Sequence, residues 1–221
     1  MAALEHPHWE AIPPRVRDVL ERIGKTVQLA PFYLAGGIAL ALRRGHRVSQ
    51  DLDFFGAVEN FDDDWTQRLI SEFRAQFDVR VERDSFLGVT LDVEGASVSF
   101  MTYGYALLDS TDELARVQIA GLTDIGLMKL DAISSRGARK DFYDLYCVAR
   151  EMSLDSLFQQ ADAKFPNTPY FVSRSLEALV DFEIADKQDE PELLVPVAWA
   201  QVKMFFTEQA RRLGHLWIQD S

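Results

Sequence analysis

Residues 34–55 read LAGGIALALRRGHRVSQDLDFF, and this stretch decides how the first half of the chain folds. The glycine pair Gly36 and Gly37 stands between a short apolar run that predicts a strand and a segment with the apolar pattern of a helix. The stretch ends in DLDFF, where Asp51 and Asp53 interrupt a second strand. Alternate residues of a strand project to the same side, so we expect the two carboxylates on one face, about 7 Å apart along the chain.

Two carboxylates so close are unfavourable unless water or a cation separates them, and a divalent cation resolves the conflict. Mg²⁺ (or Mn²⁺) is held in proteins by one or two carboxylates together with substrate phosphates. The glycine pair adds a place for those phosphates, because backbone N–H groups at a helix start attract anions and glycine permits close approach. A second interpretation stays open, in which Asp51 and Asp53 lie on an edge strand and face water alone.

Apolar periodicity predicts a change of architecture along the chain. It predicts helices over 15–28 and 62–77 and strands over 87–95 and 97–103 in the first half. From residue 123 onward it predicts helices over about 123–136, 138–151, 154–165, 169–183 and 195–213. We therefore expect an α/β (α+β) fold, with a mixed sheet flanked by helices in a domain of residues 1–110. A C-terminal helical bundle, residues 111–221, is expected to follow and to contribute to the active-site cleft.

The strands over 87–95 and 97–103 are predicted to form a hairpin with its turn at Gly95 and Ala96. In this register Asp92 faces Ser99 across the ladder, and we expect Asp92 to approach the metal site or its surroundings. In the alternative interpretation the face that carries Asp92 is exposed to solvent.

The composition describes a globular chain of 221 residues, 48% hydrophobic and 26% charged. The single cysteine, Cys147, excludes an internal disulfide and a cysteine-based zinc site, and it is expected to be buried in a helix. The sequence shows neither a signal-peptide core nor an apolar run of about 18 residues, so we expect a cytoplasmic protein without membrane contact.

The net charge of −12 opposes broad binding to a nucleic-acid backbone, which depends on Lys and Arg. A local basic group follows the glycine pair and consists of Arg43, Arg44, His46 and Arg47. Two interpretations stay open: a patch that binds phosphate or lines the path of an acceptor, or a solvated helix end whose cations favour the helix dipole.

Three segments of the chain resemble one protein family. The glycine pair with SQDLDFF (49–55) resembles motif I of the polymerase-β-type nucleotidyltransferases, and more narrowly of the AbiEii/AbiGii toxin family. LTDIGLMKLDAISSRG (122–137) resembles the lysine-bearing helix of that family, and RKDFYDLY (139–146) resembles its next signature. The three segments occur in the family's order between about residues 33 and 150, and the helical remainder is similar in character alone.

The resemblance implies transfer of a nucleoside monophosphate from an NTP to an acceptor, with the 3′ end of tRNA favoured. It also implies the toxin of a toxin–antitoxin or phage-defence system, whose partners are an NTP, tRNA and a cognate antitoxin protein. Together with the residue chemistry it predicts these roles: metal binding by Asp51 and Asp53, phosphate binding by Gly36, Gly37, Ser49 and Lys129, and a further catalytic contribution from Lys129 and Asp144. The sequence does not identify the base of the NTP, the antitoxin or the oligomeric state.

Lys129 lies in an apolar helical pattern, where its ammonium group must reach solvent or meet an anion. Asp144 follows three residues after Asp141 and so lies on the same helix face. The resemblance favours a Lys129 that grips the nucleotide phosphates, whereas the alternative is a buried Lys–Asp pair that joins two helices. Arg136 and Lys140, like Arg43, are basic candidates for phosphate or RNA contacts, with surface solvation as the alternative.

The chain departs from the superfamily pattern at one position. Many of these enzymes supply a third metal carboxylate from a later strand, where this chain has Ser99. An alternative function is therefore a nucleotidyltransferase-fold protein that binds a nucleotide or a partner with little or no catalysis. A third hypothesis is transfer of the nucleotide to a protein hydroxyl.

Overall fold

The structure is a computed structural model that describes residues 2–26, 29–58 and 63–217. The chain divides into two compact units: unit 1 contains residues 1–106 and 110–121, and unit 2 contains residues 107–109 and 122–221. The units are not consecutive segments, because β7 (Asp112–Leu114) and β8 (Val117–Ile119) join the sheet of unit 1. The predicted domains 1–110 and 111–221 stay a prediction.

Unit 1 is built on a mixed eight-stranded sheet with the order β1-β7-β8-β2-β3-β6-β5-β4. The remaining strands are β1 (Ala2–Ala3), β2 (Tyr33–Leu34), β3 (Leu52–Gly56), β4 (Val79–Ser85), β5 (Gly88–Val93) and β6 (Ala96–Thr102). Strand β3, which contains Asp53, runs parallel to β6 and antiparallel to β2. The carboxylate-bearing strand is therefore central in the sheet, and the interpretation of an edge strand is wrong.

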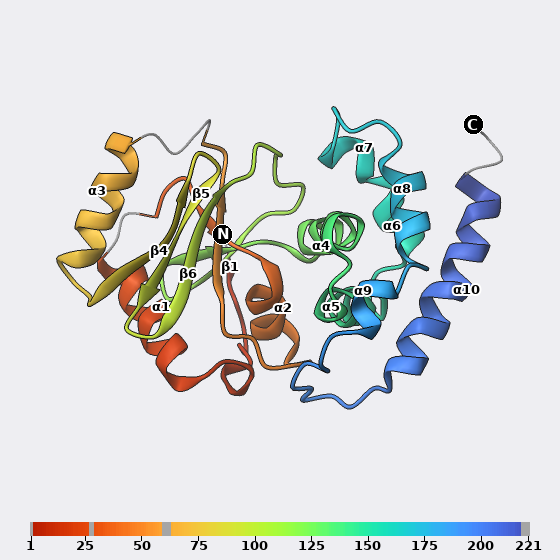
Figure 1. Cartoon of the computed structure of the whole chain (residues 1–221), viewed down its shortest axis with the longest axis horizontal. Helices are drawn as coiled ribbons and strands as arrows, with labels where there is room; N and C mark the ends of the chain where they lie inside the picture. The colour runs from red at the N-terminus through yellow and green to blue at the C-terminus, as the bar shows by residue number, and fades with distance from the viewer. Residues whose placement is uncertain (1, 27–28, 59–62, 218–221) are drawn as a thin grey trace. The chain divides into compact units, whose positions relative to one another are not determined.

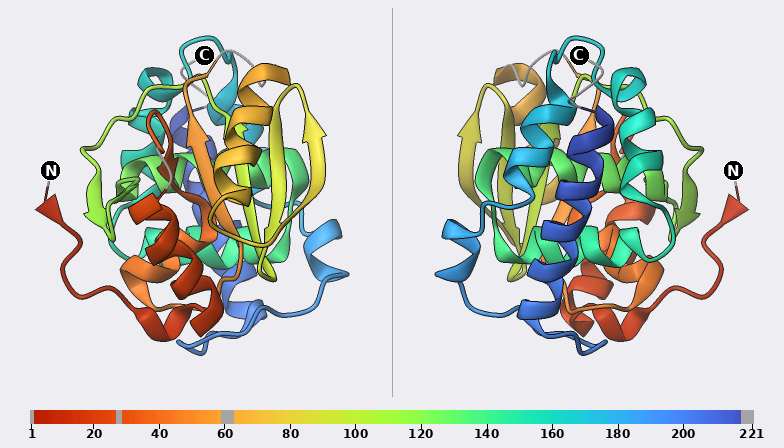
Figure 2. Two further views of the ribbon diagram at one scale, coloured as in Figure 1. Left: turned by 90° about the vertical axis from the view of Figure 1, so that its left-hand side faces the viewer. Right: turned by 90° about the vertical axis from the view of Figure 1, so that its right-hand side faces the viewer.

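Helices cover both faces of this sheet. They are α1 (Pro14–Thr26), α2 (Gly36–Arg44) and α3 (Asp63–Arg74), with a short 3₁₀ helix η1 (Trp9–Ala11). Helices α1 and α3 lie on one face and α2 on the other (Figure 1; Figure 2, left). The predicted helices also included residues 27, 28 and 62, which lie outside the described residues.

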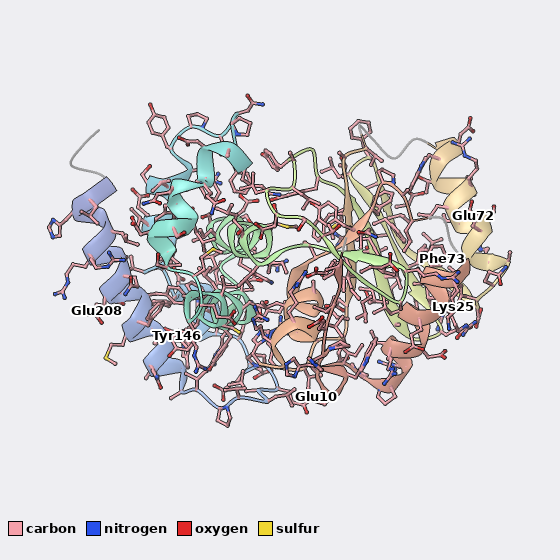
Figure 3. All side chains as sticks on the ribbon, turned by 180° about the vertical axis from the view of Figure 1, so that it is seen from behind. Glu10, Lys25, Glu72, Phe73, Tyr146 and Glu208 are labelled. Atoms are coloured by element: carbon pink, nitrogen blue, oxygen red, sulfur yellow. The ribbon has the colours of Figure 1, made fainter. Side chains whose placement is uncertain are left out.

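Alternation along β3 separates the core of unit 1 from the polar face. Leu52 and Phe54 are fully buried, whereas Asp53 and Phe55 are partly exposed on the opposite side. Phe54 stacks on Phe100 of β6 at 5.0 Å. Phe73 of α3, which Figure 3 labels, meets the ring of Phe100 at 5.6 Å. The aromatic core beneath α3 thus fixes which face of β3 carries the carboxylates.

The hairpin of β5 and β6 turns one residue earlier than predicted. Glu94 and Gly95 form its turn with φ of 53° and 81°, the double positive φ that a type I′ turn requires. This one-residue shift moves every cross-strand partner by two, so Asp92 pairs with Ser97 and not with Ser99. The predicted register is wrong because Glu94 takes a positive φ. The turn is therefore formed by Glu94 and Gly95 and not by Gly95 and Ala96.

Unit 2 is helical, and the predicted fold class of a mixed sheet followed by a helical bundle is confirmed. Its helices are α4 (Leu122–Arg136), α5 (Arg139–Ala149), α6 (Leu154–Gln159), α7 (Ala161–Lys164), α8 (Phe171–Ala178), α9 (Glu183–Asp186) and α10 (Trp199–Trp217). Helix α4 packs against α5 and α8, and α10 packs against the same two helices. Tyr146 of α5, which Figure 3 labels, contacts Phe205 of α10, with ring centroids 5.1 Å apart.

The prediction of one helix over 154–165 is wrong, because α6 and α7 are separate helices.

Within the described parts of the chain, none of the helices combines the length and the apolar character that a membrane span requires.

Candidate active site

The start of α2 lies directly against Asp53. The Ala35 N–H donates to the Asp53 carbonyl oxygen at 3.0 Å, and Ala35 supplies no side-chain cap to the helix. Gly36 has φ of +70°, and a β-carbon placed on it would lie 3.0 Å from Asp53 Oδ2. A side chain here would add about 1–2 kcal/mol of backbone strain and crowd the carboxylate. Gly36 therefore lets a helix N-terminus and a carboxylate share one small space.

The second glycine makes room for a cation and a hydroxyl. A β-carbon on Gly37 would lie 2.2 Å from Arg47 Nη2 and 3.2 Å from Ser49 Oγ. Arg47 and Ser49 are buried, and Arg47 Nη1 donates to the Val48 carbonyl at 3.0 Å. A guanidinium, a hydroxyl and the positive end of a helix dipole thus meet at the glycine pair, which favours a bound anion.

Arg47 comes from the basic group that the sequence offered as a phosphate-binding patch, and the structure places it at the glycine pair. The sequence carried the signal for it: Arg47, Ser49, Asp51 and Asp53 alternate with a period of two. In an extended segment this spacing sends all four side chains to the same side.

The donor groups around Asp53 fit a hard cation. Asp51 directly precedes β3 and is partly exposed, and Asp53 pairs in the parallel ladder with Ser99. Ser99 Oγ lies 3.1 Å from Thr90 Oγ1, so hydroxyl oxygens continue the row beyond the carboxylate. Mg²⁺ prefers such oxygen ligands and usually takes the rest of its shell from substrate phosphates and water.

Within the part of the chain that the structure describes, no third acid joins the carboxylate pair. Among residues 2–26, 29–58 and 63–217 there is no group of three or more His, Cys, Asp or Glu side chains able to hold a metal. Asp92 lies on β5, two strands from Asp53 and so about 10 Å away. Its Oδ1 accepts a hydrogen bond from the Gly95 N–H at 3.1 Å. Asp92 therefore caps the hairpin turn, and its predicted place opposite Ser99 is wrong.

Arg43 belongs to the internal structure of unit 1. Its Nε donates to the Ala120 carbonyl at 2.9 Å, and its Nη1 pairs with Asp112 Oδ2 at 2.7 Å. The Arg43 side chain is 8% exposed. It ties α2 to the β7–β8 hairpin, so the interpretation of a solvated helix end is wrong for Arg43, as it is for the buried Arg47.

In unit 2, Lys129 joins α4 to α5 through two buried carboxylates. Lys129 Nζ lies 2.8 Å from Asp141 Oδ1 and 2.6 Å from Asp144 Oδ2. Arg136 completes the cluster, because its Nε and Nη2 bind the two oxygens of Asp141 at 2.7 and 2.8 Å. The buried Lys–Asp pair that the sequence left open is therefore present, with Asp141 as an additional partner.

The charges of this cluster balance. Burial is the largest influence on Asp141 and opposes its ionisation, but Lys129 and Arg136 together outweigh it and hold the pKa of Asp141 below its ordinary value. Lys140, the remaining predicted residue of α5, is exposed at the helix surface.

A second buried ion pair in unit 2 was not predicted. Lys164 Nζ lies 2.6 Å from Asp124 Oδ1, and both side chains are 0% exposed. Asp124 also accepts the N–H groups of Leu108 and Asp109 at 2.9–3.1 Å. The pair thus anchors the segment 107–109 to the start of α4, far in sequence from the glycine pair and the aspartates.

The glycine pair and the two aspartates lie in the part of the chain that matches the model of a known protein family. A model of the family described as "Nucleotidyl transferase AbiEii toxin, Type IV TA system" matches residues 18–85. An uncharacterized protein of Aquifex aeolicus is 32% identical over 200 residues, which span 88% of this chain and 94% of that protein.

Solved structures agree on the fold. MenT4, a nucleotidyltransferase toxin of Mycobacterium tuberculosis, superposes with a TM-score of 0.52 at 17% identity, covering 90% of this chain and 86% of MenT4. The crystal structure of ANT(2")-Ia in complex with adenylyl-2"-tobramycin has a TM-score of 0.52 at 12% identity, covering 73% of this chain and 99% of that one. At these identities the likeness concerns the fold, and it confirms the predicted nucleotidyltransferase-like architecture.

Proposed function

Since the chain belongs to the AbiEii nucleotidyltransferase toxin family, we propose that it transfers a nucleoside monophosphate from an NTP to an acceptor hydroxyl. The observation that carries this proposal is the contact between the two halves of motif I. The Asp53 carboxylate lies against Gly36 at the N-terminus of α2, while Gly37 lies against Arg47 and Ser49. A phosphate-binding helix start and a carboxylate pair are the two parts that transfer from a triphosphate requires.

In the proposed reaction an acceptor oxygen bonds to the α-phosphorus of the NTP. The bond from that phosphorus to the oxygen bridging to the β-phosphate breaks, pyrophosphate leaves with the bridging oxygen, and the hydroxyl proton passes to solvent. The Gly36 and Gly37 N–H groups, Ser49 and Arg47 would bind the triphosphate. Asp51 and Asp53 would hold a divalent cation, which when bound orients the triphosphate and stabilises charge on the attacking and leaving oxygens.

The proposal extends to the charged cluster of unit 2. The family resemblance assigns Lys129 to the nucleotide phosphates and Asp144 to the same function. This role rests on the resemblance, because the Lys129 ammonium already contacts the carboxylates of Asp141 and Asp144 within unit 2.

For the acceptor and the partners we propose the 3′ end of tRNA and a cognate antitoxin protein. The family description as a toxin of a type IV toxin–antitoxin system supports the antitoxin. The net charge of −12 restricts an RNA acceptor to contacts at its end, because long phosphate-backbone contacts need cations. Arg43 does not supply them, since its guanidinium binds Asp112 and two backbone carbonyls.

Ser99 favours a second candidate function, a protein that binds a nucleotide or a partner without catalysis. Ser99 pairs with Asp53 in the ladder at the place where related enzymes are expected to carry an acid. A hydroxyl is a weaker ligand for Mg²⁺ than a carboxylate.

One experiment separates these two candidates and the transfer to a protein hydroxyl. The protein is incubated with each α-³²P-labelled NTP, Mg²⁺ and either total bacterial RNA or protein extract. Label in RNA of tRNA size supports the proposed transfer, and label in a protein band supports transfer to a protein hydroxyl. Absence of label with all four nucleotides, combined with measurable NTP binding, supports the non-catalytic candidate.

A further inference from the structure

A row of aromatic rings continues from the carboxylates along the same face of the sheet. Phe55 follows Asp53 by two residues on β3, and both are partly exposed. The ring of Phe55 lies 6.4 Å from that of Tyr33 and 5.5 Å from that of Tyr103, and Tyr103 lies 5.0 Å from Tyr105. We call Tyr33, Phe55, Tyr103 and Tyr105 the aromatic strip.

The strip is solvent-accessible on one side. Tyr33 is buried, whereas Phe55, Tyr103 and Tyr105 are partly exposed. Gly104 lies between the last two tyrosines, and a β-carbon placed on it would meet no heavy atom within 4 Å. Three rings of the strip are therefore accessible to a planar group, and no neighbour fills the position of a β-carbon on Gly104.

The strip lies at the opposite end of β3 from the glycine pair. Strand β2 runs antiparallel to β3 and pairs Tyr33 with Phe55, so the chain from Tyr33 to Gly37 runs back toward the start of β3. The glycine pair therefore lies level with the two aspartates, Ser49 lies toward the start of the strand, and the rings lie beyond Asp53. Two residues of strand place Phe55 about 7 Å beyond Asp53.

This order indicates from which side the acceptor approaches in the proposed reaction. In an in-line displacement the attacking oxygen approaches opposite to the leaving pyrophosphate. If the glycine pair and Ser49 hold the phosphates that leave, the acceptor enters from the side of the aromatic strip. The inference thus rests on the proposed function.

We propose that the aromatic strip binds an unpaired nucleobase at the end of an RNA acceptor by stacking, and so selects the acceptor. Aromatic side chains stack on single-stranded bases without needing positive charge. This suits a chain with a net charge of −12, for which phosphate contacts are weak. The stacked base would place the terminal ribose hydroxyl next to the carboxylate pair.

The test compares short RNA acceptors that end in a normal nucleotide with acceptors that carry an abasic 3′ residue. Tyr105→Leu and Tyr103→Leu remove rings of the strip, and Phe86→Leu removes an exposed ring elsewhere in unit 1 as the matched control. Loss of one stacking contact raises the KM for the normal acceptor by about tenfold or more. The KM for the NTP stays at the wild-type value, the abasic acceptor shows no further loss, and Phe86→Leu behaves as wild type.

Three results would overturn the inference. An unchanged acceptor KM would remove the strip from acceptor binding, and a raised NTP KM would reassign it to the base of the donor. An equal loss for normal and abasic acceptors would show a structural effect. An RNA that ends in 2-aminopurine tests the inference without catalysis. Stacking of that base on the aromatic strip quenches its fluorescence, which reports binding. A wild-type protein that quenches the probe but transfers nothing would refute the proposed function and keep the strip.

Discussion

Asp53 Oδ2 lies 3.0 Å from the position that a β-carbon on Gly36 would occupy. This close approach joins the first residue of α2 to a residue of β3. Because Gly36 also has a positive φ, the start of α2 depends on glycine twice: once for the backbone conformation and once for the space that Asp53 fills. The catalytic proposal follows from this shared space, since a phosphate there meets N–H donors on one side and a carboxylate-bound cation on the other.

The first prediction concerns Gly36→Ala. The added methyl group costs about 1–2 kcal/mol of backbone strain and pushes against the Asp53 carboxylate, so nucleotide transfer falls more than the lost stability explains. Urea unfolding and transfer rates measured on the same preparation test both effects.

Gly214→Ala serves as the matched control, because Gly214 lies in α10 and, among the described residues outside its own helix backbone, no heavy atom lies within 4 Å of an added β-carbon. It should leave transfer unchanged and raise the free energy of unfolding by about 0.5–1 kcal/mol. Equal loss of activity in both variants would contradict the role given to Gly36.

The second prediction separates the two roles of Lys129. Lys129→Met leaves two buried carboxylates without their shared cation, and Lys164→Met does the same to Asp124. Each change destabilises the protein by about 3–5 kcal/mol. At low temperature, where the folded fraction of both variants is matched by circular dichroism, Lys129→Met loses NTP binding and transfer whereas Lys164→Met retains them. Retained transfer in folded Lys129→Met would leave Lys129 a purely structural role.

The third prediction is a pH dependence that originates at Asp141. Its folded-state pKa is lower than the unfolded value of 3.8, so its contribution to stability is complete above that value and is lost as the pH falls through the lowered pKa. Arg136→Gln removes one cause of the lowering. The acid-unfolding midpoint of this variant, followed by circular dichroism, should therefore move to higher pH. An unchanged midpoint would show that Lys129 alone holds Asp141 ionised.

The fourth prediction concerns Asp92, which caps the turn after β5 through the Gly95 N–H. Asp92→Asn keeps an acceptor for that N–H, so we expect wild-type transfer rates and a loss of stability below about 1 kcal/mol. Mg²⁺ titration of the transfer rate provides the measurement. A higher Mg²⁺ requirement in Asp92→Asn would instead show that this carboxylate takes part in metal binding.

The sequence was sufficient for motif I because its signals are local. The glycine pair, the helix up to Gly45 and the strand with two aspartates lie within 22 consecutive residues, and each depends on neighbours of known spacing. The buried Lys129 was predictable for a similar reason: a cation in an apolar helix needs an anion, and Asp144 lay in the next helix.

The features that were missed depend on contacts distant in sequence or on an unusual backbone conformation. Arg43 looked like a surface cation because Asp112 and Ala120, its partners, lie far along the chain. The hairpin register failed because Glu94, a residue that rarely takes positive φ, does so beside Gly95. Strand β4 escaped prediction since six of its seven residues are exposed and its sequence, VRVERDS, is largely polar.

The central claim is that Asp51 and Asp53 catalyse nucleotide transfer beside the glycine pair. Its most direct test measures pyrophosphate release and α-³²P label incorporation together, for the wild type and for Asp53→Asn, at equal folded fraction. We predict that the wild type releases one pyrophosphate for each nucleotide incorporated. Asp53→Asn should lose more than about 100-fold in both measurements, since even residues that merely support metal ligands cost 10–100-fold when they are changed. Equal incorporation by wild type and Asp53→Asn would contradict the account.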